Sequence, residues 1–283
     1  MPQGGSQITD IIKLVREKRL DEVNLWSLIA LGSCEVNLAE VLGGGEEDGQ
    51  SGGEQKRFFI EKIALDSKRM AGAALKRADK LLNAASMGYQ SSGYHVISVD
   101  ASLAERGLFS VSSSFGQVIF EVGLSFDWIL NLPFIAGSSI KGAVRSAWRV
   151  LHGDDGDEVF GGKQVGSVVF MDAYPVSAGR EGYIFYPDVL TPHYSKEGKD
   201  VFDETEASPV PVAYLTVAPG TVFRFQIAVK SDRVMDMNKL LKSLLYAFRM
   251  GLGAKTAIGY GVFKVESNTI KVKVCGGTGC EHG

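Results

Sequence analysis

The chain has 283 residues, 45% of them hydrophobic and 22% charged, with a formal net charge of −3 at pH 7. This length suits one large domain or two small ones, and the apolar share is enough for a well-buried core. The slightly acidic balance excludes a surface that attracts nucleic acid everywhere, so any RNA or DNA site must be local. The opening residues, MPQGGSQITD, lack the order of a secretory signal and no long apolar run follows, so we expect a cytoplasmic protein without membrane contact.

The cysteines do not indicate a disulfide framework. Cys34, Cys275 and Cys280 are few and unevenly spaced, which agrees with a reducing compartment. The final stretch, CGGTGCEHG, also offers Glu281 and His282 as possible zinc ligands, but no second ligand pair follows, and a frayed glycine-rich tail explains it as well. We therefore expect no metal and no cofactor.

The N-terminal part is predicted to be helical. Thr9 or Asp10 can cap an apolar pattern that continues over residues 7–42, and a flexible glycine-rich loop is expected at 43–53. A long amphipathic helix is predicted over about 54–87, from apolar residues at helical spacing: Phe59, Ile63, Met70, Ala74 and Leu81. A second, basic row on this helix consists of Lys62, Arg69, Lys76 and Lys80. The basic row suits either a solvated face or the edge of a groove.

The composition changes from residue 115. The segment FGQVIFEVGLSFDWIL (115–130) is rich in β-branched and aromatic residues and predicts a strand. Pro133 and a glycine-serine turn follow. A helix is then predicted over 139–152, with Ser138 or Ser139 as its N-cap.

The remaining elements complete a recognisable order. Strands are predicted at 166–174 and 221–229, and a leucine-rich helix capped by Asn238 at 238–250. A last strand or strand pair is predicted from GYGVFKV (259–265) and TIKVKV (269–274). The order strand, helix, strand, strand, helix, strand predicts an α+β, ferredoxin-like (RRM-like) core with an antiparallel sheet.

The expected organisation has three parts. Residues 1–110 form a helical region packed on the core, 111–274 form the ferredoxin-like domain, and 275–283 form a flexible tail. Core strands two and three are separated by an insertion at about 175–220. Because this insertion is longer than a compact domain needs for a connection, we expect a functional arm.

The stretch 251–261, GLGAKTAIGYG, contains four glycines and is called the glycine loop below. A phosphate-binding P-loop is excluded, because Ala254 occupies a required glycine position and because a P-loop leads from a strand into a helix. The end of the stretch partly matches the RNA-stacking strand of RNA recognition motifs, and Tyr260 or Phe263 suits either base stacking or the core. What remains is a loop whose backbone can closely approach another backbone.

The glycine loop resembles the signature of the RAMP superfamily of CRISPR-associated proteins, two glycine-hydrophobic-glycine triplets separated by five residues. LPFIAGSSIKGAVRSAW, residues 132–148, is similar to the helix start of that family. DVLTPHY, residues 188–194, is similar to a motif of one subgroup, the sixth subunits of type III-B Cmr effector complexes. The resemblance covers about residues 115–265 and is weak before them.

Lys141, Arg145 and Arg149 are spaced by four residues, so they should line one side of the helix, with few acids nearby until Asp154. A solvated face would also explain this row. The resemblance implies that this face and the glycine loop hold the backbone of a guide RNA, which gives register and affinity rather than sequence recognition. The expected RNA-binding residues are Ser138, Ser139, Lys141, Arg145, Arg149, Gly251, Gly253, Lys255, Thr256, His193 and Tyr194.

Two residues of DVLTPHY are candidates for catalysis. Asp188 and His193 are a carboxylate and an imidazole five residues apart, suited to a metal ligand and a general base. No second histidine accompanies them as a general acid, and no acidic cluster completes a two-metal site, so we expect no catalytic residue. His193 and Tyr194 stacking on RNA, or a structural turn at Thr191 and Pro192, are the alternatives.

The sequence therefore predicts a non-catalytic RNA-binding subunit. The resemblance implies that it helps to hold the 3′ part of a CRISPR RNA in a type III-B complex that silences complementary RNA. The implied partners are CRISPR RNA, target RNA, the repeated backbone subunit, the small helical subunit and the capping subunit. A RAMP endoribonuclease that processes guide precursors and a protein-only scaffold are the alternative functions.

Overall fold

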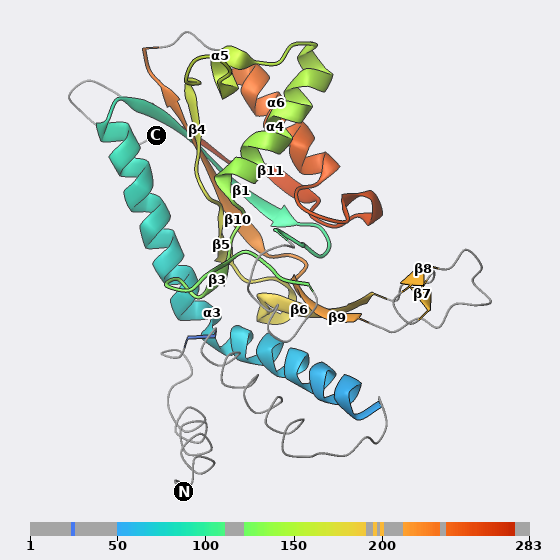
Figure 1. The fold of residues 1–283 in the computed structure, drawn as a ribbon. Helices are drawn as coiled ribbons and strands as arrows, with labels where there is room; N and C mark the ends of the chain where they lie inside the picture. The colour runs from blue at the N-terminus through green and yellow to red at the C-terminus, as the bar shows by residue number, and fades with distance from the viewer. Residues whose placement is uncertain are drawn as a thin grey trace, which may run out of the picture.

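The computed structural model describes residues 24–25, 50–110, 122–190, 195–196, 199–200, 212–232 and 236–274. An antiparallel main sheet carries helices on both faces (Figure 1), so the expected mixture of helix and antiparallel sheet is confirmed. Most of the helix predicted at 7–42, the strand residues 115–121, His193, Tyr194 and the tail at 275–283 lie outside the described residues, as do all three cysteines. No helix in the described ranges is long and apolar enough to span a membrane.

The main sheet is built around one central strand. Strand β1 (Tyr94–Leu103) pairs antiparallel with β10 (Val222–Lys230) on one side and with β11 (Phe263–Lys273) on the other. The far edge of β10 pairs with β4 (Val168–Phe170) and with β5 (Tyr174–Ser177). The last two predicted strands are confirmed as β10 and β11, and the second predicted strand is divided between β4 and β5.

Strand β1 corrects the expectation that residues 1–110 are helical. Its sequence, YHVISVDASL, follows the period of two that is typical of strands. Ile97 and Val99 belong to the hydrophobic core on one face of the sheet, whereas Ser98 and Asp100 point to the other face. This alternation suits a strand whose two faces are covered by different layers of the protein.

The first predicted strand is also corrected. In its described part only β2 (Phe126–Asp127) is extended, and it pairs with β3 (Leu132–Pro133). The side chain of Asp127 explains the short length, because its Oδ1 accepts hydrogen bonds from the backbone N–H groups of Ile129 and Leu130, both at 2.8 Å. Such a carboxylate closes a turn and ends the strand.

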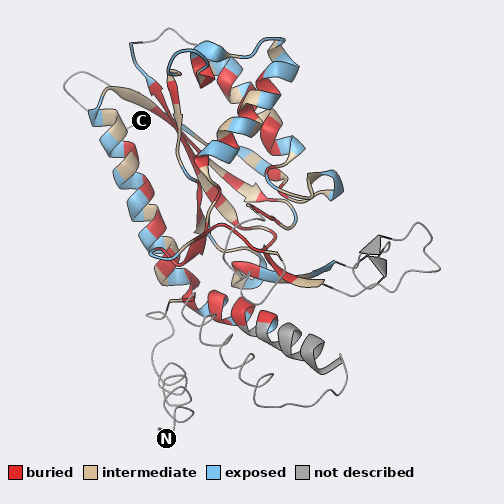
Figure 2. Cartoon of the chain, in the orientation of Figure 1, coloured by how far each residue is buried: buried red, intermediate tan, exposed pale blue. Residues whose placement is uncertain are grey.

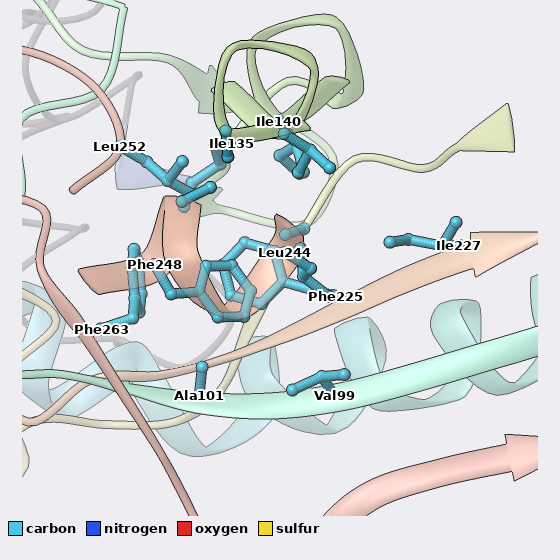
Figure 3. Packing of buried hydrophobic residues seen from close by; sticks show 14 of the residues in the cluster. Val99, Ala101, Ile135, Ile140, Phe225, Ile227, Leu244, Phe248, Leu252 and Phe263 are labelled. Carbon is cyan, nitrogen blue, oxygen red and sulfur yellow. The ribbon is translucent and has the colours of Figure 1, made fainter. Parts of the chain in front are cut away.

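Helices α4 (Gly137–His152) and α6 (Met237–Met250) cover one face of the main sheet and confirm the two helices predicted there. The core between them and the sheet is strongly aromatic (Figure 3). The ring of Phe225 on β10 lies 4.5 Å from that of Phe248 and 5.2 Å from that of Phe263, measured between centroids. This packing fixes the end of α6, from which the glycine loop departs.

The N-cap predicted for α6 lies two positions after the observed cap. Asp236, not Asn238, caps the helix, because its carboxylate accepts hydrogen bonds from the backbone N–H groups of Asn238 at 3.0 Å and Lys239 at 3.2 Å. An aspartate at this position also places a negative charge at the positive end of the helix dipole.

The long helix predicted near residues 54–87 is confirmed as α3 (Gln50–Ser91), which lies on the opposite face of the sheet from α4 and α6 (Figures 1 and 2). Ile63, Met70 and Ala74 are buried as expected. Leu81 is instead 46% exposed, and Leu82 is buried in its place. The buried face turns gradually around the helix, since a spacing of seven residues drifts relative to 3.6 residues per turn.

A charged contact joins α3 to the sheet. Arg224 on β10 points towards α3, and its Nε and Nη2 donate to the two carboxylate oxygens of Asp100, at 2.7 and 2.9 Å. Its Nη1 donates to Oδ1 of Asp79 on α3, at 2.6 Å. The hydrogen bond to Asp100, which outweighs the effect of burial, raises the pKa of Arg224. The guanidinium therefore holds a helix and two strands together.

Replacing Arg224 with alanine is expected to lower the free energy of unfolding by about 2 kcal/mol, because two partly buried carboxylates lose their charged donor. Urea unfolding of the purified chain measures this change. Arg69→Ala is the matched control, since Arg69 is 55% exposed and reaches Asp66 only at 3.4 Å. Equal stability of the two variants would contradict the structural role of Arg224.

A second antiparallel pair lies beside the main sheet. Strand β6 (Phe185–Leu190) follows the short helix η2 (Arg180–Gly182) and pairs with β9 (Val212–Val217). The small pair of β7 (Ser195–Lys196) and β8 (Lys199–Asp200) projects beyond its far end (Figure 1). The β6–β9 pair contacts α3 and brings Asp188 towards the glycine loop.

Candidate functional site

The glycine loop packs its glycines against the chain itself. At Gly253, φ is +92° and an added Cβ would lie 2.4 Å from the carbonyl oxygen of Leu108. At Gly261, φ is +67° and an added Cβ would lie 1.9 Å from the carbonyl oxygen of Leu252. An added Cβ at Gly251 would meet Thr256 at 2.9 Å. The close approach expected at Gly251 and Gly253 is therefore made by this chain's own atoms.

Backbone hydrogen bonds hold the loop to the segment that follows β1. The N–H of Ala254 donates to the carbonyl of Leu108 at 2.9 Å, and the N–H of Gly261 donates to the carbonyl of Arg106 at 2.8 Å. The N–H of Leu252 donates to the carbonyl of Gly261 at 2.9 Å and closes the loop on itself. The loop is thus a fixed structure in which both ends are bonded.

Asp188 joins the two sequence motifs. Its Oδ1 accepts hydrogen bonds from Nη1 of Arg106 at 3.1 Å and from the backbone N–H of Val189 at 2.9 Å. Its Oδ2 accepts from the hydroxyl of Tyr214, directly opposite on β9, at 3.1 Å, and from the hydroxyl of Tyr260 in the glycine loop. The Asp188 side chain is only 9% exposed. DVLTPHY and the glycine loop therefore meet at this carboxylate.

The protonation states suit this arrangement. Burial, supported by hydrogen bonding and by the charge of Asp188, raises the pKa values of Tyr214 and Tyr260. Both hydroxyls consequently stay protonated at neutral pH and donate to the carboxylate. Burial lowers the pKa of Arg106, but the hydrogen bond with Tyr260 and the charge of Asp188 outweigh it, and the pKa is raised overall. Arg106 is a permanent cation beside Asp188.

Asp188 has a positioning role in this geometry. Four donors use its two oxygens, which leaves little capacity to act as a general base or a metal ligand. Within the described residues, no group of three or more His, Cys, Asp or Glu side chains is arranged to hold a metal ion. The other candidate, His193, lies outside those residues.

Lys255 turns its ammonium group inward. Its Nζ donates to the Tyr214 hydroxyl at 2.5 Å and lies 4.6 Å from the centre of the Tyr214 ring and 5.5 Å from that of Tyr260. The backbone of Lys255 has φ of +59°, a left-handed conformation that is uncommon for a residue with a side chain. Thr256 is half-buried in the short helix η4 (Thr256–Ile258) that follows.

The start of α4 differs from its prediction. Neither Ser138 nor Ser139 is the N-cap: the helix begins at Gly137 after Ala136, which has no side chain able to cap. The N–H of Gly137 instead donates to Oδ1 of Asp172, at 2.7 Å. Position 137 requires glycine, because an added Cβ would lie only 2.2 Å from a backbone oxygen of β4. Both serines are exposed in the first turn.

The basic row on α4 is largely neutralised, contrary to expectation. Arg145 donates to Oδ1 of Asp157 at 2.5 Å, to the carbonyl of Asp155 at 3.1 Å and to the carbonyl of Gly161 at 3.2 Å. Arg149 donates to Oδ1 of Asp155 at 2.5 Å. These acids come from the loop after α4 and from α5 (Asp157–Phe160), which folds back along the helix. Both arginines hold this loop in place.

Lys141 is the member of that row without a hydrogen bond or ion pair to another described residue, and it is half-buried. Its helix turn lies near the glycine loop. Leu252 of the loop belongs to the same core cluster as Ile135 and Ile140 at the start of α4, and Figure 3 draws the three on one side of the core. The structure thus brings the two predicted parts of the site to one end of the helical layer.

Sequence reasoning missed Arg106 and Tyr214. Tyr214 sits opposite Asp188 only through the register of β6 and β9, which are separated by 21 intervening residues, 191–211. Arg106 reaches Asp188 across 82 residues of sequence. The nearest sequence signal is Asp188 itself, a carboxylate in a strand whose partners must be hydrogen-bond donors.

The comparisons with known proteins agree on a family. A family model described as the RAMP superfamily matches residues 39–264. The chain belongs to the RAMP superfamily. A curated relative, the CRISPR system CMR subunit Cmr6 of Saccharolobus solfataricus, is 36% identical over 216 residues, which are 75% of this chain and 73% of the relative. Within the RAMP superfamily the chain belongs to the Cmr6 family, and the resemblance predicted from the sequence is confirmed.

One solved structure shares the fold of this chain. A chain in the cryo-EM structure of the type III-B Cmr-beta bound to cognate target RNA matches with a TM-score of 0.78 and 31% identity, over 94% of this chain and 98% of that chain. The crystal structure of Cmr6 from Pyrococcus furiosus matches with a TM-score of 0.38 and 21% identity, over 62% of this chain and 98% of that chain. This Cmr6 family member therefore shares its fold with the Cmr-beta chain almost end to end.

Proposed function

We propose that this chain is a non-catalytic, RNA-binding structural subunit of a type III-B CRISPR effector complex. In this role it helps to hold the 3′ part of a CRISPR RNA for silencing of complementary RNA. The observation that carries the proposal is the likeness, at 31% identity over 94% of this chain, to a chain of Cmr-beta bound to cognate target RNA. The proposed partners are CRISPR RNA, target RNA and the backbone, small helical and capping subunits, in the cytoplasm.

The proposed RNA contacts are at the start of α4 and on the glycine loop. Ser138 and Ser139 are exposed in the first turn of a 16-residue helix, where the dipole favours negative charge. Lys141, in the same turn, adds a cation that makes no ion pair with the described residues. Together these groups suit a phosphate, and phosphate contacts hold any guide sequence equally well.

On the glycine loop, Lys255 and Thr256 are the proposed contacts. Lys255 would bind a phosphate by turning its ammonium outward from the rings of Tyr214 and Tyr260. Gly251 and Gly253 act indirectly, by fixing the shape of the loop. His193 and Tyr194, in the arm that follows β6, are further proposed contacts. The proposed role of Arg145 and Arg149 is structural, because their guanidinium groups already bind the loop after α4.

The domain organisation belongs to the same proposal. The order β1, α4, β4 and β5, β10, α6, β11, with the strands arranged β11-β1-β10-β4, supports a ferredoxin-like core that begins at β1. The pair β6–β9 then occupies the insertion proposed at about 175–220, and α3 belongs to the N-terminal region that packs on the core. The absence of catalysis is supported by the four donors that occupy Asp188.

Replacing Lys141 with alanine is expected to weaken guide RNA retention and to reduce the dependence of affinity on salt by about one phosphate contact. The assay uses the full chain with its backbone subunit and a labelled guide RNA, titrated at several salt concentrations. Arg145→Ala is the matched control on the same helix face. It should lower the melting temperature and leave the salt dependence unchanged, since the guanidinium of Arg145 is already bound to Asp157.

Other outcomes point to other functions. If Lys141→Ala leaves the salt dependence of RNA affinity unchanged, the proposed phosphate contact at the start of α4 is wrong. Cleavage of the RNA that is lost in His193→Ala would make the chain an endoribonuclease. Normal assembly with protein subunits, without RNA retention by the wild-type chain, would make it a protein-only scaffold.

A further inference from the structure

A line of cations and tyrosines runs between α3 and the glycine loop. Nζ of Lys68 on α3 lies 4.7 Å from the centre of the Tyr183 ring. The Tyr183 ring meets the Tyr186 ring edge to face, with 6.1 Å between their centres. The guanidinium carbon of Arg106 lies 5.5 Å from the centre of the Tyr186 ring. Tyr183 and Tyr186 are close in sequence, but Lys68 and Arg106 reach the two rings from distant parts of the chain, so the tertiary fold sets the line.

Arg106 continues the line into the glycine loop through Asp188. The contacts already described then lead to Tyr260, Tyr214 and Lys255. We call the whole set the cation–tyrosine row: Lys68, Tyr183, Tyr186, Arg106, Tyr214, Lys255 and Tyr260. Its two ends differ, because Tyr214 is buried whereas Tyr186 is 38% exposed and the Arg106 side chain is 37% exposed.

The cation–tyrosine row carries a net positive charge, although the chain as a whole carries a net negative charge. Its three cations face one carboxylate, Asp188, which leaves a net charge of +2, and the chain as a whole carries −3. The neighbouring charges, Arg180, Glu105 and Glu181, reduce the local total by one but leave it positive. A local positive patch on an acidic protein favours a polyanion at that patch.

We propose that the exposed end of the cation–tyrosine row, Lys68, Tyr183, Tyr186 and Arg106, is a stacking site for single-stranded RNA. The tyrosine rings receive unpaired bases, and Lys68 and Arg106 bind the adjoining phosphates. This pattern of aromatic faces between cations binds single strands with little sequence preference. The site rests on the proposed RNA-binding function and adds a second contact region, separate from the start of α4.

RNA explains the row better than a protein partner does. Protein interfaces concentrate apolar side chains at their centre, whereas all four residues at this end carry a charge or a ring already in contact with a cation. The lysine and arginine also have no other ion pair among the described residues than that of Arg106 with Asp188. A cation beside a partly exposed tyrosine ring is the combination that binds single-stranded RNA.

The test measures binding of a fluorescein-labelled oligouridylate of about 12 nucleotides by the full chain, using fluorescence anisotropy. Tyr186→Ala is expected to weaken binding roughly ten-fold, as is typical when one stacking ring is lost. Tyr186→Phe keeps the ring and should bind like the wild type. Tyr89→Ala, which removes a tyrosine far along α3, is the control for general effects of losing an aromatic side chain.

A second measurement does not depend on a variant. Oligouridylate that contains 4-thiouridine is irradiated with the wild-type chain, and the crosslinked peptide is identified by mass spectrometry. A crosslink on Tyr183 or Tyr186 is expected. Equal affinity of Tyr186→Ala and wild type, together with crosslinks elsewhere, would overturn the site.

The outcomes separate this site from the wider proposal. If Lys141→Ala weakens RNA binding and Tyr186→Ala does not, the stacking site fails and the RNA-binding function stands. If the wild-type chain binds neither oligouridylate nor guide RNA, both fail. If Tyr186→Ala binds RNA normally but no longer copurifies with the other Cmr subunits, the row is a protein interface and the stacking site is wrong.

Discussion

Gly261→Ala is expected to lower the free energy of unfolding by roughly 4 kcal/mol, combining backbone strain with overpacking. Gly261 has φ of +67°, and an added Cβ would lie 1.9 Å from the carbonyl oxygen of Leu252, far inside van der Waals contact. Relief would require the loop to open, which would break the hydrogen bond from Leu252 N–H to Gly261 and the one from Gly261 N–H to Arg106. The change is measured by denaturant unfolding of the purified chain.

Gly259→Ala is the matched control for this prediction. Gly259 also has a positive φ, +94°, but an added Cβ there would meet nothing within 4 Å. Its cost should therefore be that of the backbone conformation alone, about 1–2 kcal/mol. If the two variants unfold at the same denaturant concentration, the close contact between Gly261 and Leu252 does not determine the shape of the loop.

Asp188→Ala is expected to lower the free energy of unfolding by about 3 kcal/mol, because a largely buried carboxylate that accepts four hydrogen bonds is lost. Loss of the acceptor costs most at the hydroxyl of Tyr214, because Tyr214 is fully buried and its hydroxyl cannot donate to water instead. Arg106 loses its counter-charge but is 37% exposed, so water replaces part of that interaction.

Two further variants sharpen the Asp188 prediction. Asp188→Asn keeps the shape but replaces one acceptor oxygen with an NH₂ group, so its cost should lie between those of wild type and alanine. Asp232→Ala, at a carboxylate 67% exposed and 3.8 Å from Lys230, should change stability little. Thermal unfolding followed by circular dichroism compares the three. An alanine variant as stable as Asp232→Ala would show that Asp188 does not hold the arm to the loop.

The helices are the part of the fold that the sequence predicts best. Helices α3, α4 and α6 each repeat apolar residues at helical spacing for several turns, and that signal is local. Their ends are less predictable. At α4, the terminal group is the Asp172 carboxylate, which lies 35 residues away in sequence from Gly137 and leaves no local capping pattern.

Strand β1 shows why the sheet is harder to predict. It is the central strand, yet its ten residues follow directly after a long helix and contain polar positions such as Ser98 and Asp100. Asp100 is acceptable there only because Arg224 approaches from the neighbouring strand. Arg224 lies 124 residues after Asp100 in the sequence, so a prediction from neighbouring residues cannot detect this ion pair.

The candidate site is likewise predicted only in part from the sequence. The motifs identify the glycine loop and Asp188, but the partners that give them their roles come from strand register and chain packing. Arg145 and Arg149 illustrate the reverse error: their spacing along a helix indicates a free cationic row, and the loop after the helix neutralises it. Spacing predicts which side chains share a face, and only the fold decides which of them are already paired.

The central position of β1 also affects how the chain is completed during synthesis. Its two neighbours, β10 and β11, come from the last quarter of the sequence, with Tyr94 opposite Lys230 and Val96 opposite Lys273. The ribosome must therefore synthesise Arg224, 124 residues after Asp100, before the middle of the sheet gains either neighbour. Contacts so distant in sequence form slowly. The hydrophobic face of β1 thus lacks both neighbouring strands on the nascent chain until β10 has been released, the period in which such surfaces are prone to aggregate and to bind chaperones.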